Sequence, residues 1–231
     1  MLKKIKAIVV DDSALMRRII SDMINSQTEM EVIATARNGE ELLTKITREA
    51  PDVITLDIEM PKMDGKATLK ELKKININVP VIMLSSISKI GTEITMDCLE
   101  LGAFDFIAKP SGAISLDINK VKDELVQKIK LAVMNNKGKI TLDSGNDVKT
   151  NIEMMHKIKT RVGNVACHNI EAVVIGASTG GPKALYKVIT ALPDGLGVAV
   201  LVVQHMPMGF TKAFAQRLNL NSKLKVIEAQ D

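Results

Sequence analysis

Short runs of aliphatic and β-branched residues alternate with amphipathic stretches through the first half of this 231-residue chain. Five runs fit buried strands, at residues 6–10, 31–36, 53–57, 81–85 and 104–108. The stretches that follow them space apolar residues as helices do, at 13–26, 39–49, 66–75, 92–101 and 117–135. Repeated β-α units of this length predict an α/β protein with a doubly wound parallel sheet over residues 1–125.

A second, shorter α/β pattern occupies residues 169–231. It predicts strands at 172–176, 197–204 and 223–229, with helices at 182–191 and 209–218. Two β-α units and one strand bury little surface alone, so we interpret this part as the beginning of a larger, Rossmann-like α/β domain. The weaker, more polar pattern between the two predicts an interdomain linker over residues 126–168, with a short helix near 152–162.

Composition limits the classes of partner and compartment. Aromatic residues make up 2% of the chain and the net charge of +4 comes mostly from scattered lysines, which argues against nucleic-acid binding. Cys98 and Cys167 have no metal-binding or disulfide spacing, as in proteins of reducing compartments. No apolar run approaches the roughly 20 residues that span a bilayer, and the first one ends too early for a signal peptide. We therefore expect a cytoplasmic protein without membrane insertion.

Acidic side chains follow two of the predicted strands. Asp11 and Asp12 come directly after the first strand, and Asp57 ends the third. In an open parallel sheet, ligands collect at the carboxyl ends of strands where the strand order reverses. Three converging carboxylates require a cation, and hard oxygen ligands favour Mg²⁺, to which Glu59 could add its backbone carbonyl. The sequence therefore predicts a Mg²⁺ site at this edge.

Two further groups belong to the same edge. Ser85 ends the fourth strand, and Lys109 follows the fifth. A carboxylate flanked by a cation and a lysine can attack a phosphoryl group, because both charges stabilise the transition state. A single aspartate often only caps a helix, but suitable groups at the ends of several strands favour a phosphoryl acceptor.

A glycine-rich turn contains Ser178, after a predicted strand and before a helix that begins near Pro182, a favoured first helical residue. Gly176, Gly180 and Gly181 allow a sharp turn, and the amides at a helix start favour negative charge. Taken alone, such a turn serves equally well as an oxyanion-binding serine turn or as a phosphate or dinucleotide cradle.

His205 changes this balance, because it follows the next predicted strand. The ends of neighbouring parallel strands lie about 5 Å apart, so its imidazole could act as general base toward Ser178. The chain also has no G-x-G-x-x-G or Walker pattern at the turn, which counts against a nucleotide site. A hydrolase is therefore the favoured interpretation of the serine turn.

The N-terminal motifs resemble the receiver domain of two-component response regulators, over roughly residues 3–125. The matching segments are Asp11-Asp12, Asp57 with the following Glu59-Met60-Pro61-Lys62-Met63-Asp64-Gly65, Ser85, and Phe104 to Pro110. This resemblance implies a flavodoxin-like sheet that a histidine kinase phosphorylates on Asp57. It implies that Asp12, Asp57 and the Glu59 carbonyl bind Mg²⁺ directly, with Asp11 acting mainly through water. It also implies that Ser85 contacts the phosphoryl group, Lys109 pairs with it and Phe106 is the switch aromatic.

The C-terminal motifs resemble the catalytic domain of chemotaxis receptor methylesterases. They read Gly176-Ala177-Ser178-Thr179-Gly180-Gly181-Pro182, then Gln204-His205-Met206-Pro207 and Gly209-Phe210-Thr211. With the receiver in front, the chain resembles the protein-glutamate methylesterases, which also deamidate glutamine. The resemblance implies cofactor-independent hydrolysis of γ-glutamyl methyl esters on methyl-accepting chemotaxis receptors. Ser178 would attack, His205 would move the proton, and amides around Thr179 would hold the oxyanion. An unphosphorylated receiver would cover this site.

The third member of that family's triad is an aspartate from a loop much further along. Asp194 lies at the wrong end of the sheet and Asp231 is not where the family places its acid, so we assign neither. We therefore expect the 231-residue chain to be inactive by itself. An alternative of another class is a non-catalytic phospho-switch that binds a histidine kinase or receptor.

Overall fold

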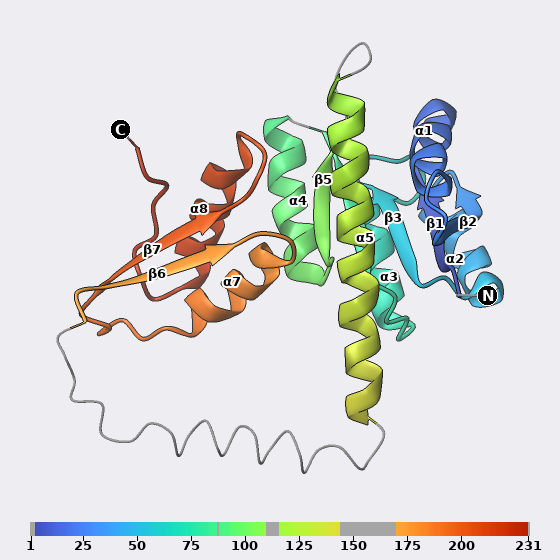
Figure 1. The fold of residues 1–231 in the computed structure, drawn as a ribbon. Coiled ribbons are helices and arrows are strands. Elements are labelled where there is room, and N and C mark those ends of the chain that lie inside the picture. The colour runs from blue at the N-terminus through green and yellow to red at the C-terminus, as the bar shows by residue number, and fades with distance from the viewer. Residues whose placement is uncertain (1–2, 87, 110–115, 144–169, 231) are drawn as a thin grey trace.

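The computed structural model describes residues 3–86, 88–109, 116–143 and 170–230 (Figure 1). The first part holds five parallel strands, β1 (Ile5–Val10), β2 (Met30–Ala36), β3 (Val53–Asp57), β4 (Val81–Ser85) and β5 (Asp105–Ala108). Their order in the sheet is β2-β1-β3-β4-β5, so the order reverses between β1 and β3. The predicted doubly wound, flavodoxin-like sheet is confirmed.

Helices cover both faces of this sheet and bury two apolar layers. Helices α1 (Ala14–Asn25) and α5 (Leu116–Asp143) pack on one face. Helices α2 (Gly39–Glu49), α3 (Gly65–Lys74) and α4 (Lys89–Leu101) pack on the other. Helices α1 to α4 each begin after a polar N-cap residue. Its side chain accepts a hydrogen bond from the backbone amide three residues later. These N-cap residues are Ser13, Asn38, Asp64 and Ser88. These caps fix where the helices start, and hence how each strand-end loop leaves the sheet.

Helix α5 is longer than the sequence pattern indicated. It continues to Asp143, so the linker that we predicted from residue 126 begins inside a helix. Ile129, Ala132 and Val133, which lie within the range predicted for this helix, pack with the apolar core on the α1 side of the sheet. The rest of the predicted linker, with its helix near 152–162, falls mostly outside the described residues.

The second part holds a two-stranded parallel sheet, β6 (Ala172–Ala177) and β7 (Ala199–Gln204). Helix α7 (Gly181–Ala191) follows β6, and α8 (Phe210–Asn221) follows β7. Exposure alternates along β6, whereas three consecutive residues of β7, Leu201 to Val203, are exposed. The two predicted β-α units are confirmed, and they form a sheet separate from the first.

The strand predicted at residues 223–229 does not form. Exposed and half-buried residues still alternate there, but no strand among the described residues pairs with this segment. The Val226 amide donates instead to the side chain of Asn219 in α8. Alternation alone predicted a strand, whereas a strand also requires a hydrogen-bonded neighbour.

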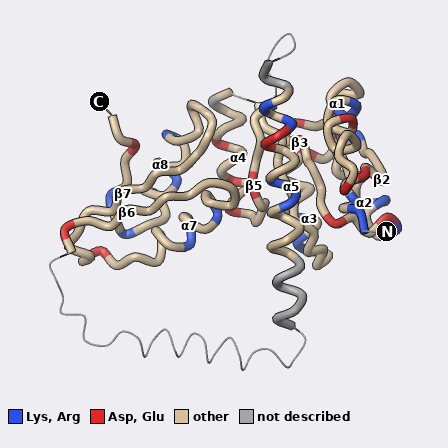
Figure 2. Tube along the Cα trace, in the orientation of Figure 1, with Lys and Arg blue, Asp and Glu red and all other residues tan. Residues whose placement is uncertain are grey.

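The two parts pack through α4. A single apolar cluster includes Met96 and Leu99 of α4, Leu185 of α7, and Phe214 and Leu218 of α8. In Figure 1, α4 lies between the five-stranded sheet and the second part. Figure 2 shows basic and acidic residues distributed over both parts. Within the described ranges, no helix combines the length and apolar character that crossing a membrane requires.

Candidate functional site

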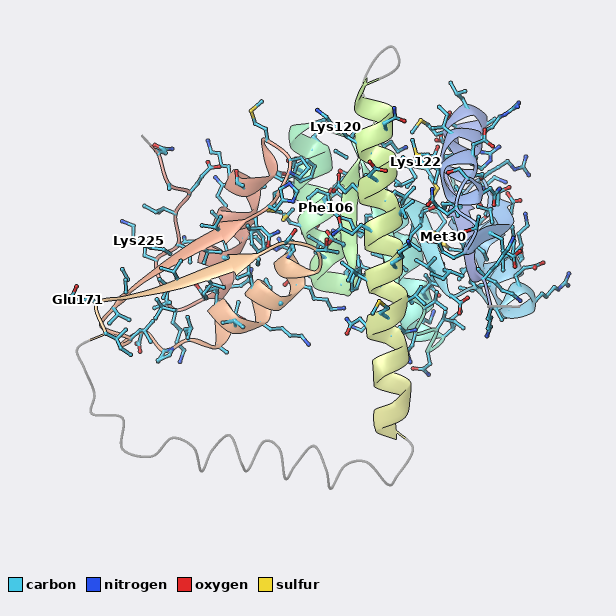
Figure 3. The ribbon with its side chains drawn as sticks, in the orientation of Figure 1. Met30, Phe106, Lys120, Lys122, Glu171 and Lys225 are labelled. Carbon is cyan, nitrogen blue, oxygen red and sulfur yellow. The ribbon has the colours of Figure 1, made fainter. Side chains whose placement is uncertain are left out.

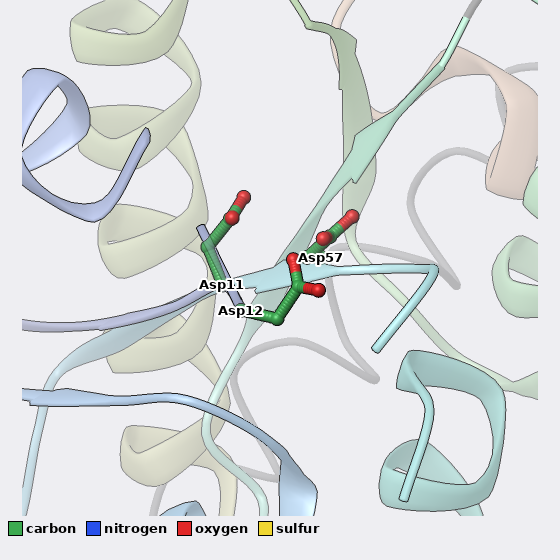
Figure 4. A group of neighbouring side chains, drawn as sticks. All are labelled: Asp11, Asp12 and Asp57. Atoms are coloured by element: carbon green, nitrogen blue, oxygen red, sulfur yellow. The ribbon is translucent and has the colours of Figure 1, made fainter. Parts of the chain in front are cut away.

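The three predicted carboxylates meet at the edge of the large sheet, where the strand order reverses. Asp11 and Asp12 follow β1, and Asp57 ends β3 beside it (Figure 4). One oxygen from each of the three lies within 4.8 Å of the others. Asp11 and Asp57 are buried, whereas Asp12 is exposed. This set of oxygen ligands fits a divalent cation with one open side.

Lys109 reaches into the same pocket from the end of β5. Its Nζ lies 2.7 Å from Asp57 Oδ2 and 2.9 Å from Asp11 Oδ2. Burial raises the pKa of Asp57 to about 6, against the opposing effect of the Lys109 hydrogen bond. Burial opposes the charge on Lys109 too, but its hydrogen bonds to Asp57 and Asp11 outweigh this and raise its pKa. Without a bound cation, the pocket therefore holds an electrostatically costly carboxylate.

Replacing that carboxylate should stabilise the metal-free protein. Since the pKa of Asp57 is about 6 in the folded chain, above its ordinary value of 3.8, folding favours its protonated form. The stabilising contribution of the protonated Asp57 side chain is therefore present at low pH and is lost as the pH rises through about 6. We expect Asp57→Asn to raise the free energy of unfolding by about 1–3 kcal/mol at about pH 7, and by progressively less toward about pH 4.

Urea titrations in chelator across this pH range would measure the gain. The exposed Asp12→Asn is the matched control in the same pocket and should give no comparable stabilisation. An Asp57→Asn effect that is negative, or equal at all pH values, would show that burial does not govern this carboxylate.

The remaining predicted receiver residues surround the pocket. Ser85 is buried, and its hydroxyl lies 2.6 Å from that of Thr95 on α4. Glu59 and Asp12 line one hollow beside the carboxylates, and the Glu59 amide lies 3.3 Å from Asp57 Oδ1. The structure thus brings Glu59 to the cluster, while Ser85 is engaged with α4.

The serine turn lies at the end of β6. Gly180 has a left-handed φ of +71°, and the Gly181 amide donates to the Ser178 carbonyl at 2.7 Å, which closes the turn just before α7. His205 follows β7, and its amide donates to the Ala177 carbonyl at 3.0 Å. The parallel pairing therefore brings Ser178 and His205 to adjacent strand ends, as predicted.

Their reactive atoms face one another. Ser178 Oγ lies 3.5 Å from His205 Nδ1. This distance is longer than the 2.6–3.2 Å typical of catalytic hydrogen bonds, but such long distances are common in structures without substrate. Among the described residues, no backbone carbonyl accepts a hydrogen bond from the Thr179 amide. The turn thus offers a nucleophile, a base and an amide donor.

The large sheet touches this turn directly, through a residue that the sequence analysis did not single out. Asp105, at the start of β5, accepts a hydrogen bond from the Gly180 amide at 2.6 Å. Lys128 of α5 lies 3.3 Å from the other carboxylate oxygen. Asp105 is 2% exposed, and a charged residue within a predicted buried strand was the available signal that it had a partner.

The predicted switch aromatic joins the same interface. Phe106 is buried and stacks on Phe210, the first residue of α8, with ring centroids 4.5 Å apart. Figure 3 places Phe106 on the side of the first part that faces α8. Neighbouring positions of β5 therefore contact the chain just after Ser178 and just after His205.

Polar contacts also join α4 to α7 and α8. Arg217 of α8 pairs with Asp97 at 2.5 Å and also with Glu100. The Tyr186 hydroxyl of α7 donates to Glu100 at 2.8 Å, and Lys183 Nζ donates to the Gly102 carbonyl at 3.0 Å. The α4–β5 side of the five-stranded sheet thus covers α7 and α8, the helices that follow Ser178 and His205.

Family models match both parts of the chain. A model described as "Response regulator receiver domain" matches residues 7–118, and one described as "CheB methylesterase" matches residues 173–231. Among solved structures, the response regulator domain of Thermotoga maritima CheB is 45% identical. It aligns with a TM-score of 0.51, over 57% of this chain and 97% of that one.

Curated relatives match along the whole chain. A protein-glutamate methylesterase/protein-glutamine glutaminase of Clostridium acetobutylicum is 54% identical over 230 residues, and its namesake from Bacillus subtilis is 49% identical over 230. The alignments cover 100% and 98% of this chain, but 63% of each relative. The chain therefore spans less than two thirds of the length of these relatives.

Proposed function

Because this chain belongs to the response-regulator methylesterase family, with a receiver followed by the first part of a CheB methylesterase domain, we propose that its full-length form is a phosphorylation-controlled protein-glutamate methylesterase. Its substrates would be γ-glutamyl methyl esters on methyl-accepting chemotaxis receptors, and glutamine deamidation would be a side activity. The observation that carries the proposal is the facing Ser178 and His205 pair, in a turn that also contacts β5 of the receiver.

In the receiver, Asp57 would accept a phosphoryl group from a chemotaxis histidine kinase. One Asp57 oxygen attacks phosphorus as the bond to the donor breaks, and Lys109 Nζ, 2.7 Å away, stabilises the charge. Asp11, Asp12, Asp57 and the Glu59 carbonyl would hold Mg²⁺, which would neutralise the phosphoryl oxygens when bound.

In the esterase part, Ser178 Oγ would attack the ester carbonyl while His205 Nδ1 takes the hydroxyl proton. The same imidazole returns this proton to the departing methoxide, which leaves as methanol. Water then attacks the acyl carbon with His205 as base, and the bond to Ser178 Oγ breaks, which restores the serine and leaves a γ-carboxylate on the receptor glutamate. The Thr179 amide would donate to the oxyanion in both steps. His205 Nε2 remains for an orienting acid from the longer chain.

Phosphorylation would act through the α4–β5 contacts. A phosphoryl group on Asp57 offers the Ser85 hydroxyl a charged acceptor, which competes with its bond to Thr95 of α4. In the present arrangement the Asp105 carboxylate accepts the hydrogen bond of the Gly180 amide. Its negative charge disfavours the formation of a negatively charged oxyanion on the same turn. Separation of β5 and α4 from α7 and α8 would free the turn for substrate.

Weakening this interface should raise activity without phosphorylation. Arg217→Met removes the ion pairs of Arg217 with Asp97 and Glu100. Asp97 still pairs with Lys66, and Glu100 still accepts the hydrogen bond of the Tyr186 hydroxyl, so neither carboxylate loses every partner. For half-exposed pairs we expect about 1 kcal/mol, or roughly a fivefold higher unphosphorylated rate, with the phosphorylated rate unchanged. Initial rates of methanol release would measure this. Arg18→Met removes an exposed pair on α1 and should change neither rate; an unchanged basal rate in Arg217→Met would contradict the covering role of α4.

The proposed activity itself is tested with the full-length protein and membranes that carry methylated receptors. We expect methanol release in the presence of Mg²⁺ and a small-molecule phosphodonor. No release under these conditions, from protein whose receiver is shown to be phosphorylated, would overturn the methylesterase assignment.

A further inference from the structure

Gln204, the last residue of β7, places its side-chain amide beneath the serine turn. Its Nε2 donates to the Ser178 carbonyl at 3.1 Å and to the His205 carbonyl at 2.8 Å. Both partners are carbonyl oxygens, which only accept hydrogen bonds, so the amide nitrogen must be the group that faces them. One side chain therefore joins the backbones of the two proposed catalytic residues.

The close packing of this amide depends on Gly181. A Cβ at that position would lie 2.1 Å from Gln204 Oε1 and 2.9 Å from the Ala177 Cβ. Gly181 does not have a positive φ, so backbone conformation alone does not require glycine there. Gln204 Oε1 is buried and has no hydrogen-bond partner among the described residues. The space for the glutamine amide thus comes from the missing side chain of Gly181.

The hydrogen bond to Ser178 has a consequence for the next peptide group. In a planar trans peptide, the carbonyl of one residue and the amide of the next point in opposite directions. The Ser178 carbonyl is held by Gln204 Nε2 and by the Gly181 amide, so the Thr179 N–H must point away from them. That amide is the proposed oxyanion donor, and its direction is set by the plane that Gln204 helps to hold.

We propose that Gln204 is a positioning residue for the esterase, which orients the Thr179 amide toward the oxyanion and holds Ser178 and His205 in register. This inference rests on the proposed function. Gln204 touches neither substrate nor reacting atoms, so its effect belongs to the transition state, where the oxyanion forms, and not to receptor binding.

The sharpest test is Gln204→Glu in the full-length protein, since glutamate has the same shape but an ionised carboxylate cannot donate to either carbonyl. We expect kcat for methyl-ester hydrolysis to fall by roughly 10- to 100-fold, below the 10²–10³ lost when an oxyanion donor is removed outright. KM for receptor membranes should stay within about twofold, because substrate binding does not use this amide. Gln216→Glu makes the same chemical change at an exposed position of α8 and should leave kcat unchanged.

A second variant keeps the glutamine but displaces its amide. Gly181→Ala should lower kcat per folded molecule in the same way, with KM unchanged, and it decides the question if Gln204→Glu fails to fold. Folded variants with kcat within about twofold of wild type would overturn the positioning role, as would losses of kcat that only follow the loss of folded protein. If wild-type protein itself releases no methanol, the proposed function fails instead.

Discussion

Ser178→Ala should lower methyl-ester hydrolysis by the full-length protein by roughly 10⁵- to 10⁶-fold, the cost of removing the nucleophile of a serine–histidine pair. The reason is geometric: Ser178 Oγ faces His205 Nδ1 at the ends of two adjacent parallel strands. Methanol release from methylated receptor membranes, followed with enough enzyme to detect the residual rate, measures this loss.

Two further variants are measured alongside Ser178→Ala. Because Ser178 and His205 act as a unit, the double variant with His205→Gln should be no slower than Ser178→Ala alone. Ser222→Ala removes a hydroxyl that donates to the nearby Leu224 carbonyl after α8, and it should keep the wild-type rate. Hydrolysis that survives Ser178→Ala would remove the serine turn from the mechanism. Absence of hydrolysis in wild type would favour the alternative of a non-catalytic, phosphorylated binding module.

Asp57→Asn should abolish the phosphodonor response completely. Asp57 is the carboxylate that lies 2.7 Å from Lys109 and shares the cation-binding edge with Asp11 and Asp12, and an amide there cannot attack phosphorus. Intact-mass measurement before and after acetyl phosphate with Mg²⁺ would show a labile phosphoryl gain on wild type and none on the variant. Asp22→Asn, an exposed position on α1, is the matched control and should phosphorylate normally. A full gain on Asp57→Asn would place the acceptor elsewhere.

Both α/β units could be predicted from the sequence because their signals are local. Strand runs, amphipathic spacing and capping residues each depend on a few neighbours, and Asp11, Asp57 and Lys109 stand at strand ends that a parallel sheet must bring together. The pairing of Ser178 with His205 followed from the same rule. The predicted strand at 223–229 was wrong because alternation describes one segment, whereas pairing depends on a neighbour.

The interface could not be predicted in this way, since no local pattern encodes which helix faces which. Asp105 was passed over although it stands in a buried strand, because its partner Gly180 is 75 positions away. The stack of Phe106 on Phe210 likewise depends on how the two sheets are placed. Gln204 was noted only as part of a motif, and its role emerged from the two carbonyls that its amide reaches.

Phosphorylation of the receiver is proposed to control hydrolysis at the serine turn. This control is tested most directly by the ratio of initial methanol-release rates with and without phosphodonor, for full-length wild type and Asp57→Asn in parallel. We predict a ratio well above one for wild type and a ratio of one for Asp57→Asn, which should retain the wild-type basal rate. Equal ratios in the two proteins would contradict the account, because the receiver would then not govern the esterase.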